Sequence, residues 1–247
     1  MKELIKQIRA LTGAGFSECK KAAEESNGNL ESALEILKKK GIERAAKKVG
    51  NEVEHGSVII KRKENKIIVL NFRAQTDFAV KSDAFCSFVD NEANIFLNAS
   101  EESLNQTVND SNESYQDRLS FFISTLGENV VLSSEKKFIE TEEQKYVYYL
   151  HNKVNSNFDN IALLGVVLAF NKEADDEICL KIVKHVAAAD AIVLSENEIT
   201  NEMKINNSDI ENGVLLNQQF FYDNSVTIKE LIEKNNIFIK DFNVFNS

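Results

Sequence analysis

The sequence contains no proline and no tryptophan among its 247 residues. At an average usage of about 5%, a chain of this length would carry roughly a dozen prolines. We interpret their absence, together with abundant Asn, Lys, Ile and Phe, as codon drift in an AT-rich genome, most simply a bacterial one. Because proline cannot mark turns here, the element boundaries are predicted from Gly, Asn, Asp and Ser.

Cysteine is also scarce, with Cys19, Cys86 and Cys179 as its three occurrences. They are widely spaced and odd in number, which indicates neither a disulfide framework nor a zinc site. Buried thiols in a reducing cytoplasm are the favoured interpretation.

Long hydrophobic runs and excess positive charge are lacking as well. The most apolar run, residues 161–170, is far shorter than the roughly 20 residues that a membrane-spanning helix needs. The charged, amphipathic N-terminus does not resemble a signal peptide. A net charge of −10 opposes binding to phosphate backbones. These features predict a cytoplasmic protein with a protein partner, without a membrane or a direct nucleic-acid ligand.

The sequence lacks the common catalytic motifs too. It has no phosphate-binding Gly-rich loop, no dinucleotide-binding glycine triplet and no nucleophile elbow. His55, His151 and His185 are far apart and do not have metal-ligand spacing. We therefore predict no cofactor, no metal and no enzymatic activity. An enzyme that uses Cys19 or Cys86 stays as a minor hypothesis, which full activity after Cys→Ser replacement would remove.

What the chain does have begins with a helical pattern over residues 1–50. Gly13 and Gly15 separate a first helix from a second one that Ser17 is expected to cap. Asn29 is expected to cap a third helix, and Gly41 to end it. A short helical segment is expected to follow over residues 42–49.

The remaining residues alternate between strand and helix patterns. Thr227 and Glu230 form a capping-box pattern near the C-terminus. Strands are expected at 58–61, 67–72, 130–132, 146–150, 161–170 and 237–245, and helices from Ser82, from Tyr115 to Gly127, over 177–189 and from Thr227. The predicted fold class is α+β, a small all-α module followed by a two-part core with antiparallel sheets. The expected domains are residues 1–50, 51–135 and 136–247.

One polar segment, residues 74–81, lies between the predicted hairpin and the helix that begins near Ser82. Loops at such positions often carry function. Phe78 within it is either an exposed aromatic residue or a core residue beneath the following helix. Physical reasoning alone favours the core position, because isolated aromatic side chains are usually buried.

Several strings, in order along nearly the whole chain, closely resemble the elongation factor Ts family. These are Thr12-Gly13-Ala14-Gly15-Phe16-Ser17-Glu18-Cys19-Lys20-Lys21-Ala22, Asn27-Gly28-Asn29-Leu30-Glu31, Ala45-Ala46-Lys47-Lys48, Gln75-Thr76-Asp77-Phe78, Gly127-Glu128-Asn129, His185-Val186-Ala187-Ala188 and Asn217-Gln218-Gln219-Phe220. Each string alone is weak, but their order and spacing make the resemblance specific.

The resemblance implies a nucleotide exchange factor for GDP-bound elongation factor Tu. It implies a ubiquitin-associated-like three-helix fold at the N-terminus, which docks on the partner's GTPase domain. It further implies that Thr76, Asp77, Phe78 and Ala79 form a loop that displaces the partner's Mg²⁺, with Phe78 as the wedge. The other partner-binding residues that it implies are Gly13, Gly15, Phe16, His185, Val186 and Ala187.

The chain departs from the family at several places. Ala79-Val80 stands where the family usually has Val-Ala, and Asn71 and Arg73 stand where an acidic residue and an Asn are usual. A short polar stretch over 199–213 replaces a long helical hairpin. The alternative function is a ubiquitin-associated-type module that binds nascent chains or other proteins, and it would make residues 51–247 dispensable.

Overall fold

The computed structural model describes residues 1–189, 191–206 and 210–247. The predicted α+β fold class is confirmed, with helices at the N-terminus and a core of helices and antiparallel sheets. The chain forms two compact units, the first from residues 1–56 and 72–133 and the second from residues 57–71 and 134–247. The three-part domain division expected above stays a prediction.

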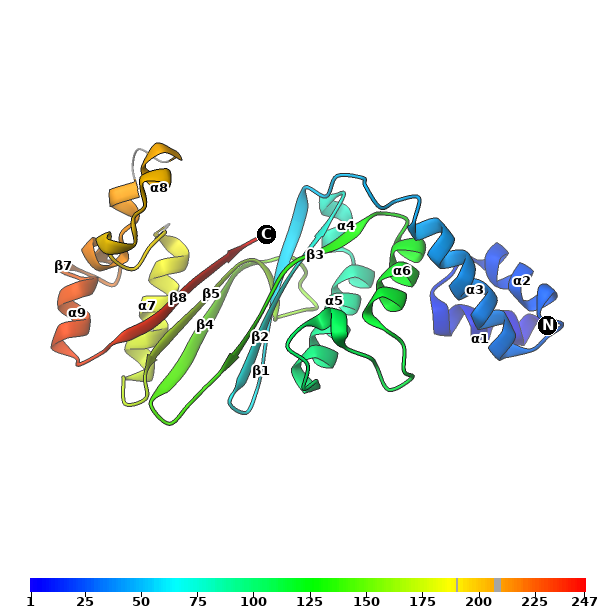
Figure 1. The fold of residues 1–247 in the computed structure, drawn as a ribbon, viewed down its shortest axis with the longest axis horizontal. Coiled ribbons are helices and arrows are strands. Elements are labelled where there is room, and N and C mark those ends of the chain that lie inside the picture. The colour runs from blue at the N-terminus through cyan, green and yellow to red at the C-terminus, as the bar shows by residue number, and fades with distance from the viewer. Residues whose placement is uncertain (190, 207–209) are drawn as a thin grey trace. The chain divides into compact units, whose positions relative to one another are not determined.

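The first three helices form a small module at the start of the first unit (Figure 1). They are α1 (Lys2–Thr12), α2 (Phe16–Glu25) and α3 (Leu30–Ala45). Gly13 ends α1 at a φ of 67°, a left-handed conformation that favours glycine. The predicted cap at Asn29 is confirmed, because its side chain accepts a hydrogen bond from Ser32 N–H at 2.9 Å. The module's core is apolar and includes Ile5, Ile8, Ala14, Cys19, Ala22, Ala23, Ala33 and Leu37.

Two predictions in this module are wrong. The N-cap of α2 is Gly15 rather than Ser17. Helix α3 also runs through Gly41 to Ala45 instead of ending there. A Cβ atom at Gly41 would lie 2.9 Å from Ser124 Oγ, so this glycine allows α3 to pack closely against α6 (Tyr115–Leu126). Its role is close packing, which the sequence pattern alone does not separate from helix termination.

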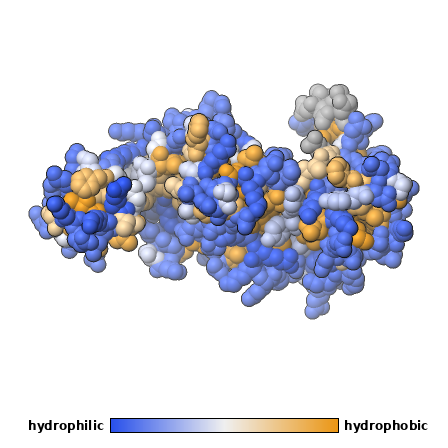
Figure 2. All heavy atoms as spheres, turned by 180° about the vertical axis from the view of Figure 1, so that it is seen from behind, coloured by the Kyte–Doolittle hydropathy of each residue, from blue (hydrophilic) through white to orange (hydrophobic). Residues whose placement is uncertain are grey.

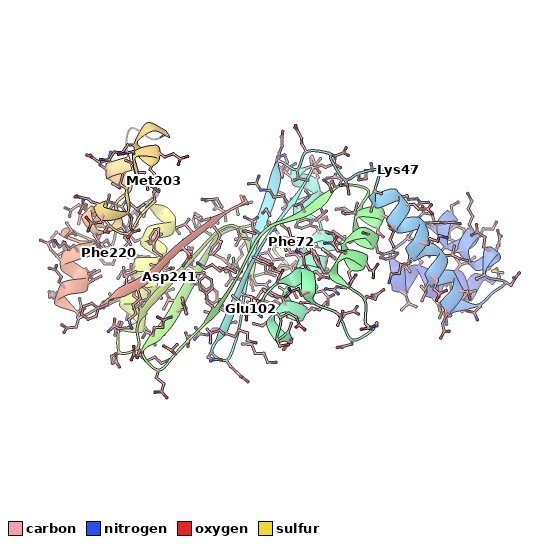
Figure 3. The ribbon with its side chains drawn as sticks, viewed as in Figure 1. Lys47, Phe72, Glu102, Met203, Phe220 and Asp241 are labelled. Carbon is pink, nitrogen blue, oxygen red and sulfur yellow. The ribbon has the colours of Figure 1, made fainter. Side chains whose placement is uncertain are left out.

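The rest of the first unit contains α4 (Asp77–Lys81), α5 (Asp83–Asn98), the short 3₁₀ helix η1 (Leu104–Gln106) and α6. The predicted cap at Ser82 is confirmed, since its hydroxyl accepts from Phe85 N–H at 3.2 Å. Phe88 of α5 and Phe122 of α6 stack with their ring centroids 4.1 Å apart. Phe72, labelled in Figure 3, packs edge-on against the Phe88 ring, with the two ring centroids 6.0 Å apart. The segment that the sequence predicts to be a loop therefore contains a short helix, α4.

The sheet has the strand order β3-β2-β1-β5-β4, with β8 also paired to β5. Its strands are β1 (His55–Lys63), β2 (Lys66–Ala74), β3 (Val130–Ile139), β4 (Gln144–Lys153), β5 (Ile161–Asn171) and β8 (Ile239–Asn246). The predicted hairpin is therefore confirmed as β1 and β2. Strand β5 pairs antiparallel with β1, β4 and β8. Its alternate residues belong to two core clusters, Val166 and Phe170 to one and Val167 to the other, and burial on both faces explains its nearly continuous apolar sequence. Leu163 near its start is nonetheless 40% exposed.

Helix α7 (Asp176–Ala188) belongs to the second unit, in which Val183 and Val186 join a core cluster with Val166 and Phe170 of β5. The unit also contains η2 (Glu196–Glu198), α8 (Asn201–Asn206), η3 (Ile210–Gly213), η4 (Leu215–Asn217), β6 (Gln219–Phe220), β7 (Asp223–Thr227) and α9 (Ile228–Lys234). The predicted capping box is confirmed between Thr227 and Glu230. The stretch over 199–213 holds α8 and η3, and its residues 207–209 lie outside the described residues. No helix in the described part of the chain is long and apolar enough to span a membrane.

Candidate partner-binding site

Phe78 is the most exposed large apolar side chain among the described residues, with 82% of its surface accessible. The expectation from physical reasoning that it belongs to the core is therefore wrong. Its neighbours Ala79 and Val80 are only 6% and 3% exposed. Successive residues of a helix point about 100° apart, so the buried pair fixes α4 to the first unit while Phe78 faces outward. Ala79 and Val80 therefore lie on the side of α4 that packs against the first unit.

Thr76 caps α4 and is itself held by a carboxylate. Its hydroxyl accepts a hydrogen bond from Ala79 N–H at 3.2 Å. The same hydroxyl donates to Glu128 Oε1 at 2.8 Å, and Thr76 N–H donates to Glu128 Oε2 at 3.0 Å. Both oxygens of Glu128 therefore bind the residue that starts the helix bearing Phe78.

A second set of contacts holds the preceding residue. Gln75 Oε1 accepts from Asn129 N–H at 2.7 Å and from Asn51 Nδ2 at 3.1 Å. Asn129 Nδ2 in turn donates to Asn51 O at 2.9 Å. We define Glu128, Asn129, Asn51 and Gln75 as the loop clamp. The sequence pattern does not indicate these roles, although the Gly127-Glu128-Asn129 string is part of the resemblance.

Asp77 places a carboxylate beside the exposed ring. Lys81 Nζ lies 2.9 Å from Asp77 Oδ2, one helical turn away. This hydrogen bond lowers the pKa of Asp77, and burial raises it by less. The Asp77 side chain is therefore ionised at neutral pH, next to an apolar side chain that faces solvent.

The turn between α1 and α2 presents further apolar surface. Gly13 takes the left-handed conformation and Gly15 caps α2, which leaves Phe16 as the first residue of that helix and 60% exposed. Leu11, just before the turn, is 65% exposed. Figure 2 shows the general pattern on one face of the molecule, where hydrophobic residues lie in patches among hydrophilic ones.

His185, Val186 and Ala187 lie inside the second unit, with exposed fractions of 2%, 2% and 8%. His185 Nδ1 accepts from Phe221 N–H at 3.2 Å, so its Nε2 carries the proton and donates to Gln218 Oε1 at 2.9 Å. His185 thus holds the segment that leads from Gln218, past the buried Phe220 labelled in Figure 3, to the exposed Phe221. The predicted contact of these three residues with a partner stays a prediction.

The His185 contacts give the second unit a pH dependence. Burial lowers the pKa of His185, and the hydrogen bond with Gln218 opposes this shift by less. The folded state therefore binds a proton less readily than the unfolded state, and stability falls as the pH drops below about 6.5, the usual pKa of histidine. We expect His185→Gln to reduce this loss. The measurement is the free energy of unfolding by urea at pH 5.5 and 7.5, and an equal pH dependence in both proteins would contradict the assignment.

The cysteines do not resemble a catalytic centre. All three are buried and carry free thiols. Burial raises the pKa of Cys86 to about 11, so this thiol stays protonated at neutral pH and is a poor nucleophile. Within the described ranges, no group of three or more His, Cys, Asp or Glu side chains is placed to hold a metal ion.

Comparisons with known proteins identify the family. The family profile described as Elongation factor TS matches residues 75–212. Elongation factor Ts of Methylorubrum extorquens strain PA1 is 31% identical over 263 aligned positions, covering 94% of this chain and 85% of that protein. Elongation factor Ts of Methylorubrum populi is 30% identical with the same coverage. That of Sinorhizobium fredii is 34% identical over 79% of this chain and 65% of that protein. The chain therefore belongs to the elongation factor Ts family of translation elongation factors.

Proposed function

We propose that this protein is the guanine nucleotide exchange factor of elongation factor Tu. It binds the GDP-bound GTPase and speeds the release of GDP, so that GTP can bind during translation elongation. The observation that carries this proposal is an aromatic side chain, Phe78, that is 82% exposed on a short helix with a side-chain cap. An apolar ring held in solvent in this way is suited to insertion into a partner.

The mechanism acts on the partner's Mg²⁺. A GTPase holds GDP through backbone amides, a lysine and an Mg²⁺ ion that screens the phosphate charge. Phe78 enters the GTPase domain beside this ion and displaces the groups that ligate it, while Thr76, Asp77 and Ala79 give the loop its shape. Without Mg²⁺ the phosphate charge is poorly neutralised, so the affinity for GDP falls.

Two further contact regions support docking in this proposal. Gly13, Gly15 and Phe16 form the turn through which the N-terminal three-helix module contacts the GTPase domain. His185, Val186 and Ala187 fix α7 and the segment after it, which lie near the partner's phosphate-binding loop. Because their side chains are buried, we assign them a positioning role in this contact.

The proposal includes the broader setting of the protein. We place its action in the cytoplasm and assign it no catalytic chemistry, cofactor or direct nucleic-acid ligand of its own. The domains we propose are residues 1–50, 51–135 and 136–247. The first would dock on the partner, and the second carries the Phe78 loop.

Thermodynamic linkage provides a test of this proposal. If the factor weakens GDP binding by a given ratio, GDP must weaken binding of the factor by the same ratio. We expect the dissociation constant of the complex with elongation factor Tu, measured by calorimetry, to rise at least about tenfold when GDP and Mg²⁺ are added, which corresponds to a coupling of about 1.4 kcal/mol. Equal dissociation constants with and without GDP would rule out exchange.

A second candidate function is a protein-binding module that acts through residues 1–50 alone. The exposed Leu11 and Phe16 are the observation in its favour. In that case Phe16→Ala in the full chain would abolish partner binding, whereas Phe78→Ala would have no effect on any activity. The exchange proposal requires an effect of Phe78→Ala on GDP release.

A further inference from the structure

We propose that Glu128 is a positioning residue that holds Phe78 ready for insertion, an inference that rests on the proposed exchange function. Helix α4 has five residues, too few to be stable in isolation. Its conformation must therefore come from tertiary contacts. The burial of Ala79 and Val80 supplies one set of contacts, and the two hydrogen bonds that Thr76 donates to Glu128 supply another.

The direction of the hydrogen bonds explains why a carboxylate is needed. The Thr76 hydroxyl has one proton, and it donates this proton to Glu128 Oε1. A lone pair of the Thr76 hydroxyl oxygen then accepts a hydrogen bond from Ala79 N–H at the start of α4. The second carboxylate oxygen accepts from Thr76 N–H. Since an ionised carboxylate only accepts, it satisfies both donors at once and fixes the hydroxyl in the capping orientation.

The backbone around Glu128 directs the carboxylate toward the loop. Gly127 ends α6 in the left-handed conformation with a φ of 83°. The chain turns there, so that Glu128 and Asn129 bind the consecutive residues Thr76 and Gln75. Asn129 is 5% exposed, which fixes the turn against the unit. The two adjacent contacts set both the position and the register of the residues before α4.

The consequence is that Phe78 is ordered before the partner arrives. A loop that becomes ordered only on binding loses part of its interaction free energy to that ordering. Removing the hydrogen bonds to Glu128 should therefore slow GDP release within the complex. It should have less effect on the affinity for the partner, because docking involves other surfaces.

The test compares Glu128→Gln with Glu102→Gln, the same chemical change at an exposed residue of the first unit, labelled in Figure 3. Each of the two Thr76 donors meets its own carboxylate oxygen, and glutamine replaces one of these oxygens by an NH2 group, so one donor of Thr76 then faces another donor. With saturating protein, we expect Glu128→Gln to slow GDP release about tenfold, a typical effect of one charge-assisted hydrogen bond. The concentration of the variant that gives the half-maximal rate of GDP release should stay within about twofold of the wild-type value. Glu102→Gln should match the wild type.

Two additional arms make the result specific. In a Phe78→Ala background, Glu128→Gln should have no further effect on release, because Glu128 acts through the ring. A further slowing there would show a general structural role and overturn the proposal. Amide hydrogen exchange of the protein alone should be faster at residues 76–81 in Glu128→Gln. Unchanged amide hydrogen exchange at residues 76–81 would overturn the role of Glu128, whatever the effect of the wild-type protein on GDP release. A wild-type protein that does not affect GDP release would reject only the proposed function.

Discussion

Replacing Phe78 by alanine is expected to slow factor-stimulated GDP release by about 100-fold, the scale of a central aromatic hot spot. The ring is 82% exposed and leaves no cavity in the core when it is removed. The free energy of unfolding should therefore change by less than about 0.5 kcal/mol. Stopped-flow release of a fluorescent GDP measures the first quantity, and urea unfolding measures the second.

Phe238→Ala is the matched control for this substitution. Phe238 is also an exposed phenylalanine, at 63%, but it lies between α9 and β8 in the second unit. Its replacement should leave GDP release unchanged. Equal rates for Phe78→Ala and Phe238→Ala would contradict the assignment of Phe78 as the ring that acts in GDP release.

Replacing Arg118 by methionine is expected to destabilise the protein by about 3–5 kcal/mol, because it leaves a buried charge without its partner. Arg118 Nε and one Nη donate to the two oxygens of Glu92 at 2.8 and 2.7 Å. The exposed fractions of Arg118 and Glu92 are 8% and 0%. Arg118 also donates to Thr107 Oγ1 and Glu113 O, so it joins α5, α6 and the loop between them.

The destabilisation by Arg118→Met should depend on pH, which provides a second test of its cause. Burial raises the pKa of Glu92, and Arg118 opposes the shift. Without Arg118, the pKa of Glu92 in the folded state lies further above its value of about 4.3 in the unfolded state. Protonation of Glu92 therefore stabilises the folded state of the variant. The difference from the wild type should be small near pH 4 and grow as the pH rises through the folded-state pKa.

A surface ion pair supplies the control for the buried one. Lys153 pairs with Asp159, whose side chain is 88% exposed. Lys153→Met should change the free energy of unfolding by less than about 1 kcal/mol at every pH. If Arg118→Met were equally mild at neutral pH, the buried pair would not hold the first unit together.

The features that the sequence predicted correctly depend on short-range chemistry. The caps at Asn29, Ser82 and Thr227 each use a side chain and a backbone N–H three residues later. The hairpin of β1 and β2 likewise follows from two β-branched runs separated by a short polar turn. Such features need only neighbouring residues, so a local pattern is enough to find them.

The wrong or missing predictions depend on contacts between distant residues. Gly41 lies within α3 at a point where Ser124, 83 positions later, leaves little room for a Cβ atom. Glu128 holds Thr76 across 52 positions, and no local pattern indicates this pair. Asn71 donates to Asn246 O at 2.6 Å, across 175 positions, which gives it a structural role in the second unit. The resemblance indicates the loop that bears Phe78, whereas the exposure of its ring depends on the packing of α4, which the sequence pattern does not show.

The most direct test of the exchange function is the rate of GDP release from elongation factor Tu in the presence of Mg²⁺. A fluorescent GDP is preloaded on the GTPase, and excess unlabelled GTP is added in a stopped-flow instrument with or without this protein. We expect a large acceleration at substoichiometric concentrations, because GTP displaces the factor and each molecule acts repeatedly. A release rate that stays unchanged at every concentration of the protein would contradict the proposed exchange function.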